Sequence, residues 1–254
     1  MATLILQLAS YYKSMIIIPD IHGRDFWVKP VEKNLGKEHI VFLGDYLDPY
    51  DYEGIPSSEV FPRFEYIIAM KKKNPDDITL LLGNHDLHYL NGDLLGGRYD
   101  YANGYRNSQA FLDNSNLFQL AYEAEVAGRK YLFTHAGVLR GWIDKNRQYL
   151  GRSEPEQISS VLNDYWGNRG YWPRLFTILA DIPYSRWGNS RFGSPVWADI
   201  KDWSDDAFEL SEIYQIFGHS QQESGPVIGE HFACLDCRKA FRLDDKGVIL
   251  PYCE

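Results

Sequence analysis

The sequence contains few cysteines for its length. Among its 254 residues only Cys234, Cys237 and Cys253 are cysteines, which is too few for a disulfide framework in a chain of this size. Cys234 and Cys237 have the C-x-x-C spacing, but no second pair follows them and no strand–helix pattern typical of a redox motif surrounds them. We interpret the pair as structural, with metal binding or redox chemistry as the minor alternative.

An excess of positive charge and long apolar segments are also missing. The 26 Lys and Arg against 35 Asp and Glu give a formal net charge of −9, which argues against nucleic acid or an anionic membrane as the main partner. A small anionic substrate at a metal-rich site stays compatible with this charge, because local charge outweighs global charge there. No segment supplies the roughly 20 apolar residues of a transmembrane helix, and the first residues lack the basic start and cleavage site of a signal peptide. We therefore expect a cytoplasmic protein.

The remaining composition is that of a globular protein, with 44% hydrophobic and 24% charged residues. We see no internal repeat, low-complexity tract or linker, so we predict one domain over residues 15–254, preceded by an N-terminal extension at 1–14. Whether Met1 or Met15 is the start stays open, as does the oligomeric state. Residues 165–205 are rich in Trp, Tyr, Gly and Pro and are expected to form an irregular but ordered insertion.

Short apolar runs of strand length recur along the chain. Such near-continuous apolar strands are typical of sheets that are covered by helices. The predicted strands are residues 15–18, 39–43, 78–82, 130–133 and 213–217. Helical spacing of apolar residues predicts helices over 58–73, 107–121 and 155–164, the last with Ser153 as a plausible cap. Short β-like runs over 226–250 end in "FRLDDKGVIL", a hairpin signal.

Each of the five predicted strands ends in a polar corner. The side chains at these corners are Asp20 and His22, then Asp45 and Asp48, then Asn84 and His85, and finally His135 and His219. Carboxylate, imidazole and amide groups together suit Mn²⁺, Fe or Zn²⁺. Gly44, Gly83 and Gly218 directly precede candidate ligands and permit tight corners and close backbone approach. One such corner carries little information, but five in one order predict a metal centre.

The order of these corners resembles the motif series of calcineurin-like metallophosphoesterases. The motifs are "D-I-H-G" (20–23), "G-D-Y-L-D" (44–48), "G-N-H-D" (83–86), "T-H-A-G" (134–137) and "G-H-S" (218–220). The sequence "S-P-V-W-A-D" (194–199) is similar to the Trp-x-Asp element of the phosphoprotein-phosphatase branch, which includes Ser/Thr protein phosphatases and bacterial diadenosine tetraphosphatases. The resemblance spans residues 16–243. It implies an α/β fold in which a mixed β-sandwich is flanked by helices, an α/β/β/α arrangement.

The resemblance also implies a site with two divalent ions, Mn²⁺ foremost, with Fe or Zn as alternatives. One ion would be held by Asp20, His22 and Asp45, and the other by Asp45, Asn84, His135 and His219, with Asp45 bridging. A hydroxide between the ions would attack phosphorus. His85 would be the general acid that protonates the leaving group, and Asp48 the carboxylate that orients it. The cysteines lack the context of a nucleophile, which argues against a cysteine-dependent phosphatase.

The expected activity is hydrolysis of a phosphorylated substrate, with three readings kept open. A Ser/Thr-protein-phosphatase-like phosphomonoesterase comes first, a dinucleoside polyphosphate hydrolase second, and a non-catalytic scaffold with the same fold third. Pro49 stands where eukaryotic protein phosphatases carry an arginine that grips phosphate, and a pyrrolidine does not replace a guanidinium. Arg186 and Arg191, just before the Trp-x-Asp element, are the candidates to replace it, although each alone is better explained as a solvated or carboxylate-paired residue.

Overall fold

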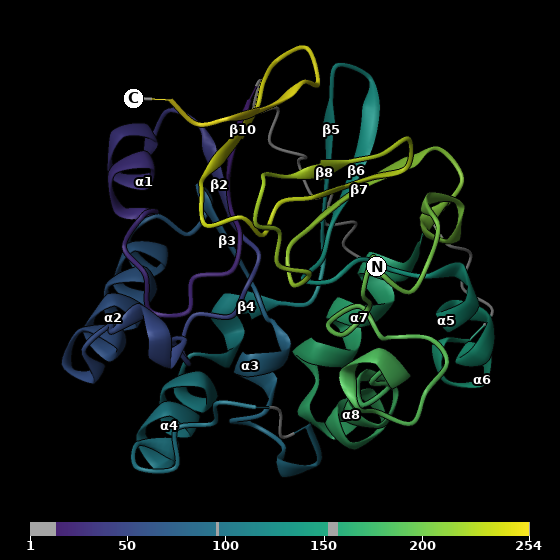
Figure 1. The fold of residues 1–254 in the computed structure, drawn as a ribbon, viewed down its shortest axis with the longest axis horizontal. Coiled ribbons are helices and arrows are strands. Elements are labelled where there is room, and N and C mark those ends of the chain that lie inside the picture. Colours follow the sequence, from purple (N-terminus) through teal and green to yellow (C-terminus); the bar gives the residue numbers. More distant parts are fainter. Residues whose placement is uncertain (1–13, 95–96, 152–156, 254) are drawn as a thin grey trace, which may run out of the picture.

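The computed structural model describes residues 14–94, 97–151 and 157–253, so the predicted extension at 1–14 lies almost wholly outside the described residues. Two mixed β-sheets form the centre of the protein (Figure 1). In the first sheet the strand order is β11-β10-β1-β2-β3-β4. Strands β1 to β4 are parallel, β10 pairs antiparallel with β1, and β11 pairs antiparallel with β10. Its strands are β1 (Met15–Ile18), β2 (His39–Phe42), β3 (Ile78–Leu81), β4 (Phe118–Gln119), β10 (Phe241–Leu243) and β11 (Ile249–Pro251).

The second sheet has the order β5-β6-β7-β9-β8. Strands β6, β7 and β9 are parallel, while β5 and β8 run antiparallel at its two edges. Its strands are β5 (Tyr122–Val126), β6 (Arg129–Phe133), β7 (Ile213–Phe217), β8 (Val227–Ile228) and β9 (Phe232–Cys234). All five strands that the apolar runs predict are therefore present.

Alternate side chains of the buried strands enter two different cores. In β1, Met15 and Ile17 belong to the cluster between the sheets, whereas Ile16 and Ile18 belong to the cluster that packs against helices. This follows from the two-residue period of a strand. Because both faces of the strand are covered by apolar layers, its sequence is apolar throughout rather than alternating.

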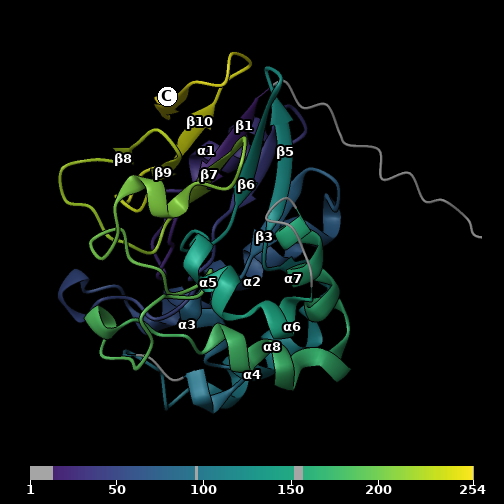
Figure 2. The ribbon, with the colours of Figure 1, turned by 90° about the vertical axis from the view of Figure 1, so that its right-hand side faces the viewer.

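Helices cover the outer faces of the sandwich. Figure 1 shows α1 (Val28–Asn34) and α2 (Ser57–Lys73) beside the first sheet. Figure 2, turned by 90°, shows the second group gathered below β5 and β6. That group comprises α5 (Arg140–Lys145), α6 (Arg147–Leu150), α7 (Ile158–Gly167) and α8 (Trp172–Leu179). The short α3 (Asn84–Leu87) and α4 (Gly104–Asp113) complete the set of α-helices in the described segments. The predicted α/β/β/α class is confirmed.

Three element predictions need correction. The helix expected at 107–121 is α4 at Gly104–Asp113, and the residues behind it form a 3-10 turn and β4. The side-chain amide of Asn114 donates back to Ala110 O at 2.7 Å, a local bond that competes with continuation of the helix. Helix α7 ends at Gly167 rather than 164, and the expected cap Ser153 lies outside the described residues. The insertion at 165–205 is less irregular than expected, because α8 lies within it.

The C-terminal hairpin is confirmed. Strands β10 and β11 pair in antiparallel register, and the carboxylate of Asp244 accepts the backbone N–H groups of Lys246 and Val248 at 2.9 Å each, which closes the turn. Among the described residues, no helix combines the length and the apolar character that a membrane crossing requires.

Candidate metal centre and active site

The predicted site residues follow β1, β2, β3, β6 and β7 in the sequence, at the carboxyl end of each strand. Parallel strands bring their carboxyl ends to one edge of a sheet, and the stacking of the two sheets brings both edges together. The first sheet supplies Asp20, His22, Asp45 and Asn84, and the second supplies His135 and His219. All six side chains are buried. Six polar side chains buried together need partners of opposite charge or polarity, because burial removes their contacts with water.

The corners that carry these side chains have unusual backbone conformations. His22, Asp45, Asp48 and His219 have φ values of 45°, 54°, 60° and 62°, a left-handed region that non-glycine residues seldom adopt. Each such residue costs of order 1 kcal/mol or more, and strain of this kind gathers at functional sites. The strained corners turn the side chains inward at the strand ends instead of letting them alternate across the sheet.

Two glycines leave room for ligand carboxylates. A Cβ at Gly83 would lie 2.1 Å from Asp45 Oδ1, and a Cβ at Gly218 would lie 2.0 Å from Asp20 Oδ1. Any side chain at either position would therefore displace a carboxylate. The close approach expected at these glycines is present.

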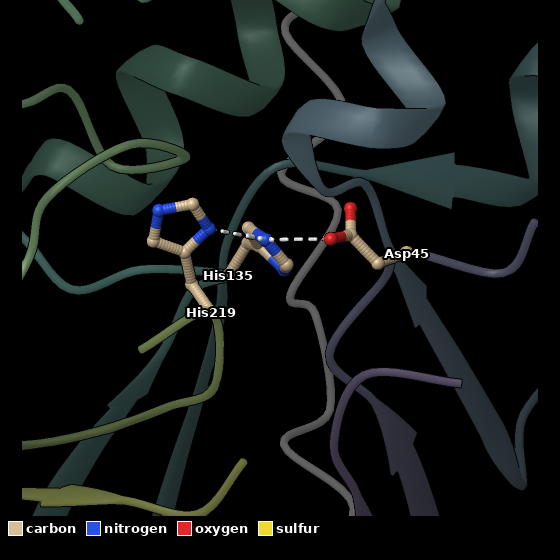
Figure 3. A group of neighbouring side chains, drawn as sticks. All are labelled: Asp45, His135 and His219. Atoms are coloured by element: carbon tan, nitrogen blue, oxygen red, sulfur yellow. Dashed lines mark hydrogen bonds and ion pairs between the residues drawn. The ribbon is translucent and has the colours of Figure 1, made fainter. Parts of the chain in front are cut away.

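One group of ligand atoms surrounds His135. Its Nε2 lies 3.5 Å from Asp45 Oδ2, 3.0 Å from Asn84 Oδ1 and 3.2 Å from His219 Nδ1. Figure 3 shows His135 between Asp45 on one side and His219 on the other. Asp45, His135 and His219 offer ligand atoms that all lie within 4.8 Å of one another.

A second group shares Asp45. Asp20, His22 and Asp45 also place their ligand atoms within 4.8 Å of one another, and His22 Nε2 lies 3.4 Å from Asp45 Oδ2. Both oxygens of Asp20 accept the backbone N–H of His219, at 2.9 and 3.1 Å. This bond joins the corner after β1 to the corner after β7, so the two sheets are tied together at the site.

The chemistry of these atoms fits a cation. His135 directs Nδ1 to Leu43 O at 2.8 Å and His22 directs Nδ1 to Leu47 O at 3.0 Å. A ring that donates from Nδ1 presents an Nε2 lone pair when neutral, and here those lone pairs face carboxylate and amide oxygens. His219 Nε2 is buried without a hydrogen-bond partner. Acceptors facing acceptors repel one another, whereas a divalent ion would satisfy them.

The pKa values agree with a ligand set. Burial lowers the pKa of His22 and of His219, where Arg186 adds to the effect, so both rings are kept in the neutral form that binds metals. Burial alone would raise the pKa of Asp45, but the imidazoles of His135 and His85 hold it below its usual range and keep the shared carboxylate ionised. Burial and the charge of Asp45 raise the pKa of Asp20, and His135 opposes this.

His85 and Asp48 form the pair that the resemblance implies. His85 Nδ1 lies 2.9 Å from Asp48 Oδ2. Two further residues hold the same carboxylate, since His88 Nε2 lies 2.7 Å from Asp48 Oδ2 and the Tyr89 hydroxyl donates to Asp48 Oδ1. Burial opposes ionisation of Asp48, but its bonds to His85 and His88 lower its pKa, which keeps it a carboxylate.

His88 lies outside the sequence motifs. It is buried, and its contact with Asp48 places it directly behind the candidate acid. Its spacing of three residues from His85 was the available signal, because residues three apart on a helix lie on the same side.

Three arginines, Arg186, Arg191 and Arg98, differ in how close they lie to the site. Arg186 Nε donates to Asp199 at 2.7 Å, and its Nη2 reaches His219 O at 3.5 Å, so it borders the site while paired with a carboxylate. Arg191 is exposed and stacks on Phe192 and Trp203, with centroid distances of 5.3 and 5.8 Å. Arg98, which the sequence reasoning missed, places Nη2 3.0 Å from His85 Nε2. Its loop has no motif or periodicity that could have indicated this.

The fold and the arrangement of corners define a metallophosphoesterase, and comparison with protein families agrees. The calcineurin-like phosphoesterase model matches residues 14–223, so the chain belongs to this family, whose chemistry implies divalent metal ions.

Among curated proteins, the chain is 28% identical over 170 residues to the symmetrical bis(5'-nucleosyl)-tetraphosphatase of Paracidovorax citrulli, covering 61% of this chain and 57% of that protein. It is 27% identical over 173 residues to the serine/threonine-protein phosphatase 6 catalytic subunit of Drosophila melanogaster, covering 58% of this chain and 51% of that protein. The matched region thus spans little more than half the length of these relatives. Both belong to the branch that the motifs indicate.

Solved structures support the fold. A cold-active protein tyrosine phosphatase aligns with a TM-score of 0.61 at 17% identity, covering 94% of this chain and 78% of that chain. A protein serine/threonine phosphatase from Saccharomyces cerevisiae aligns with a TM-score of 0.55 at 14% identity, covering 94% and 79%.

Proposed function

We propose that this protein is a phosphoester hydrolase that uses two divalent metal ions, with Mn²⁺ as the first candidate and Fe or Zn as alternatives. The observation that carries the proposal is the sharing of Asp45 between two buried ligand groups, with the His85–Asp48 pair beside them. One ion would be held by Asp20, His22 and Asp45, and the other by Asp45, Asn84, His135 and His219. When bound, such a metal pair activates water and stabilises charge on the phosphoryl group.

The chain's own residues supply the proton that the leaving group needs. Asp48 accepts from His85 Nδ1, which orients the ring. The other ring nitrogen, Nε2, then carries the proton toward the departing oxygen. His88 and Tyr89 hold Asp48 from behind, so the orientation of His85 is fixed by packing and not only by one bond.

A phosphomonoester of the kind that Ser/Thr protein phosphatases act on is the first substrate candidate. The similarity to the symmetrical bis(5'-nucleosyl)-tetraphosphatase of Paracidovorax citrulli supports a dinucleoside polyphosphate as the second. Trp187 is 98% exposed and directly follows Arg186, a position from which it could stack on a nucleobase. We propose Arg186, and more weakly Arg191, as substrate-binding residues, and a cytoplasmic location.

Asp45→Asn provides the test, because the substitution removes the charge that both ions would share. We expect purified wild type with Mn²⁺ to hydrolyse p-nitrophenyl phosphate and to prefer one of three substrates: a phosphopeptide, a dinucleoside tetraphosphate or a phosphodiester. Asp45→Asn should bind less metal by elemental analysis and lose turnover by more than 100-fold, of the order seen when charge stabilisation of a transition state is removed.

Unchanged turnover in Asp45→Asn would reject this site. A wild-type protein that retains no metal and hydrolyses no ester would instead support a scaffold with the same fold. Such a scaffold is disfavoured because a buried cluster of unpaired ligands costs stability without a cation.

A further inference from the structure

Arg98 reaches into the site. Its Nη2 lies 3.0 Å from His85 Nε2 and 3.4 Å from His22 Nε2, so one guanidinium nitrogen stands between the candidate acid and a candidate metal ligand. The guanidinium lies over the ring of Tyr50, with Cζ 3.5 Å from the centroid. This stacking fixes the plane of the fork.

The donors of Arg98 are not satisfied by an anion. Nη1 is buried and has no hydrogen-bond partner, and within the described ranges no carboxylate forms an ion pair with this residue. The neighbouring Arg24 shows the contrast, because its Nε and Nη2 are bound to the carboxylate of Glu53 at about 2.9 to 3.1 Å. A buried guanidinium nitrogen without an acceptor costs free energy until an acceptor arrives.

The segment that carries Arg98 is anchored against the residues that hold Asp48. Tyr99 packs on His88 and Tyr89, with ring centroids 5.0 and 4.8 Å apart, and the backbone N–H of Asp100 donates to the Tyr89 hydroxyl at 3.2 Å. Arg98 itself has a φ of 67°, a strained value for a residue with a side chain. The backbone is thus bent in a way that turns this arginine toward the site.

We propose that Arg98, stacked on Tyr50, binds the non-bridging oxygens of the substrate's phosphoryl group. This rests on the proposed function, since a metal at His22 Nε2 and the proton that the proposed acid carries on His85 Nε2 would remove the two lone pairs that now face Arg98 and would free its guanidinium. A phosphoryl group between the metal pair and His85 would offer the two oxygens that a guanidinium binds side by side. Pro49 leaves its own position without a phosphate-binding side chain, and Arg98 brings a guanidinium to the site from a different loop.

The experiment compares Arg98→Ala and Arg98→Lys with Arg129→Ala in the Mn²⁺-loaded full chain. Arg129 is the matched control because its guanidinium also stacks on a tyrosine, Tyr214, at 4.1 Å, but at the start of β6 and away from the site. Each variant is assayed for kcat and KM on p-nitrophenyl phosphate, for inhibition by inorganic phosphate, and for metal content.

We expect Arg98→Ala to keep its metal, to lose about 100-fold in kcat/KM, and to raise the inhibition constant of inorganic phosphate at least tenfold. Arg98→Lys should recover less than a tenth of the loss, since an ammonium cannot bind two oxygens side by side. Arg129→Ala should match wild type. Arg98→Ala values within twofold of wild type would overturn the proposal, as would loss of metal alone with unchanged phosphate inhibition in the metal-saturated variant.

Calorimetric titration of inorganic phosphate separates this proposal from the proposed function. If wild type hydrolyses no ester, the hydrolase proposal fails, yet phosphate binding that is present in wild type and lost in Arg98→Ala would still support the role of Arg98. Equal binding by both proteins, or binding by neither, would overturn it.

Discussion

Which ring nitrogen each histidine presents decides its chemistry. His22 and His135 both bond through Nδ1 to backbone carbonyls, so their Nε2 atoms are directed as lone pairs toward Asp45. His85 uses Nδ1 for the carboxylate of Asp48 instead, and its Nε2 faces Arg98 Nη2 at 3.0 Å. The three histidines of this buried site therefore fall into two kinds, which differ in the hydrogen-bond partner of Nδ1.

His85→Ala should lose rate in proportion to how much the leaving group needs a proton. We expect a loss of roughly 10² to 10⁴-fold on an alkyl phosphate and a much smaller loss on p-nitrophenyl phosphate, whose leaving group departs as an anion. Metal content should not change. The measurement is kcat/KM on a series of esters of graded leaving-group pKa.

His231→Ala is the matched control for His85→Ala, because His231 is half-buried and lies 3.9 Å from Asp205, outside the ligand groups. It should keep wild-type rates on every ester. Equal losses across the ester series in His85→Ala would show that His85 is not the proton donor.

The corners between elements position the ligands more than the strands or helices do. Asp86 illustrates how, since its carboxylate accepts the backbone N–H groups of Gly83, Asp45 and Tyr46 at 2.8, 2.8 and 3.0 Å. It thereby joins the corner after β2 to the corner after β3. Burial and the charge of Asp45 raise the pKa of Asp86, and the three N–H donors oppose that shift.

Gly218→Ala should disrupt the site through one methyl group. Its Cβ would lie 2.0 Å from Asp20 Oδ1, so either the carboxylate or the corner after β7 must move. We expect a loss of bound metal and at least a tenfold fall in turnover, since small displacements of positioned groups cost rate steeply. Elemental analysis and steady-state kinetics measure both effects.

Gly167→Ala is the control for that substitution, because a Cβ at this position at the end of α7 has nothing within 4 Å. It should leave metal content and turnover unchanged. Wild-type metal content in Gly218→Ala would mean that Asp20 does not depend on the space beside this glycine.

At the scale of the whole molecule, the site depends on the two sheets staying stacked. Asp45 comes from the first sheet, and His135 and His219 from the second (Figure 3). The cluster that holds the sheets together includes Ile17 and Ile216. Metal binding and global stability are therefore linked, since a ligand set that exists only in the folded state stabilises that state when it binds.

The free energy of unfolding of the metal-free protein should fall in mild acid, partly because of His39. Burial lowers its pKa from 6.5 to about 4, so below pH 6.5 the unfolded chain binds a proton that the folded chain excludes. The stabilising effect of the neutral ring is present above pH 6.5 and is lost as the pH falls toward 4. The difference in free energy of unfolding between wild type and His39→Gln should change by about 2 kcal/mol from pH 7.5 to 5.0.

Urea unfolding in the presence of a chelator tests the effect of His39. Chelation removes the metal-linked contribution, and the remaining acid-sensitive groups are common to both proteins. His39 lies at the start of β2, where its Nε2 is 2.9 Å from Thr79 Oγ1. A difference that stays constant with pH would show that this imidazole does not titrate with folding.

Local signals predicted much of the fold. The apolar runs predicted β1, β2, β3, β6 and β7, because strands buried on both faces are apolar throughout. The helix predicted over 107–121 was placed wrongly because the helical spacing of apolar residues continues past Asp113, where α4 ends. In the structure, Phe118 and Gln119 instead form β4, which pairs with β3. Strand pairing is a long-range interaction that helical spacing does not record.

The sequence by itself determined which metal-binding residue types stand at the strand ends, and which glycines precede them. These are local features, so they can be identified without knowledge of the fold. Only the tertiary structure decided that Asp45 stands between two ligand groups, that His88 and Tyr89 hold Asp48, and that Arg98 faces His85. Those relations join residues from separate loops and two sheets, and the distances between them depend on how the sheets stack. Spacing along the chain carries no record of that stacking.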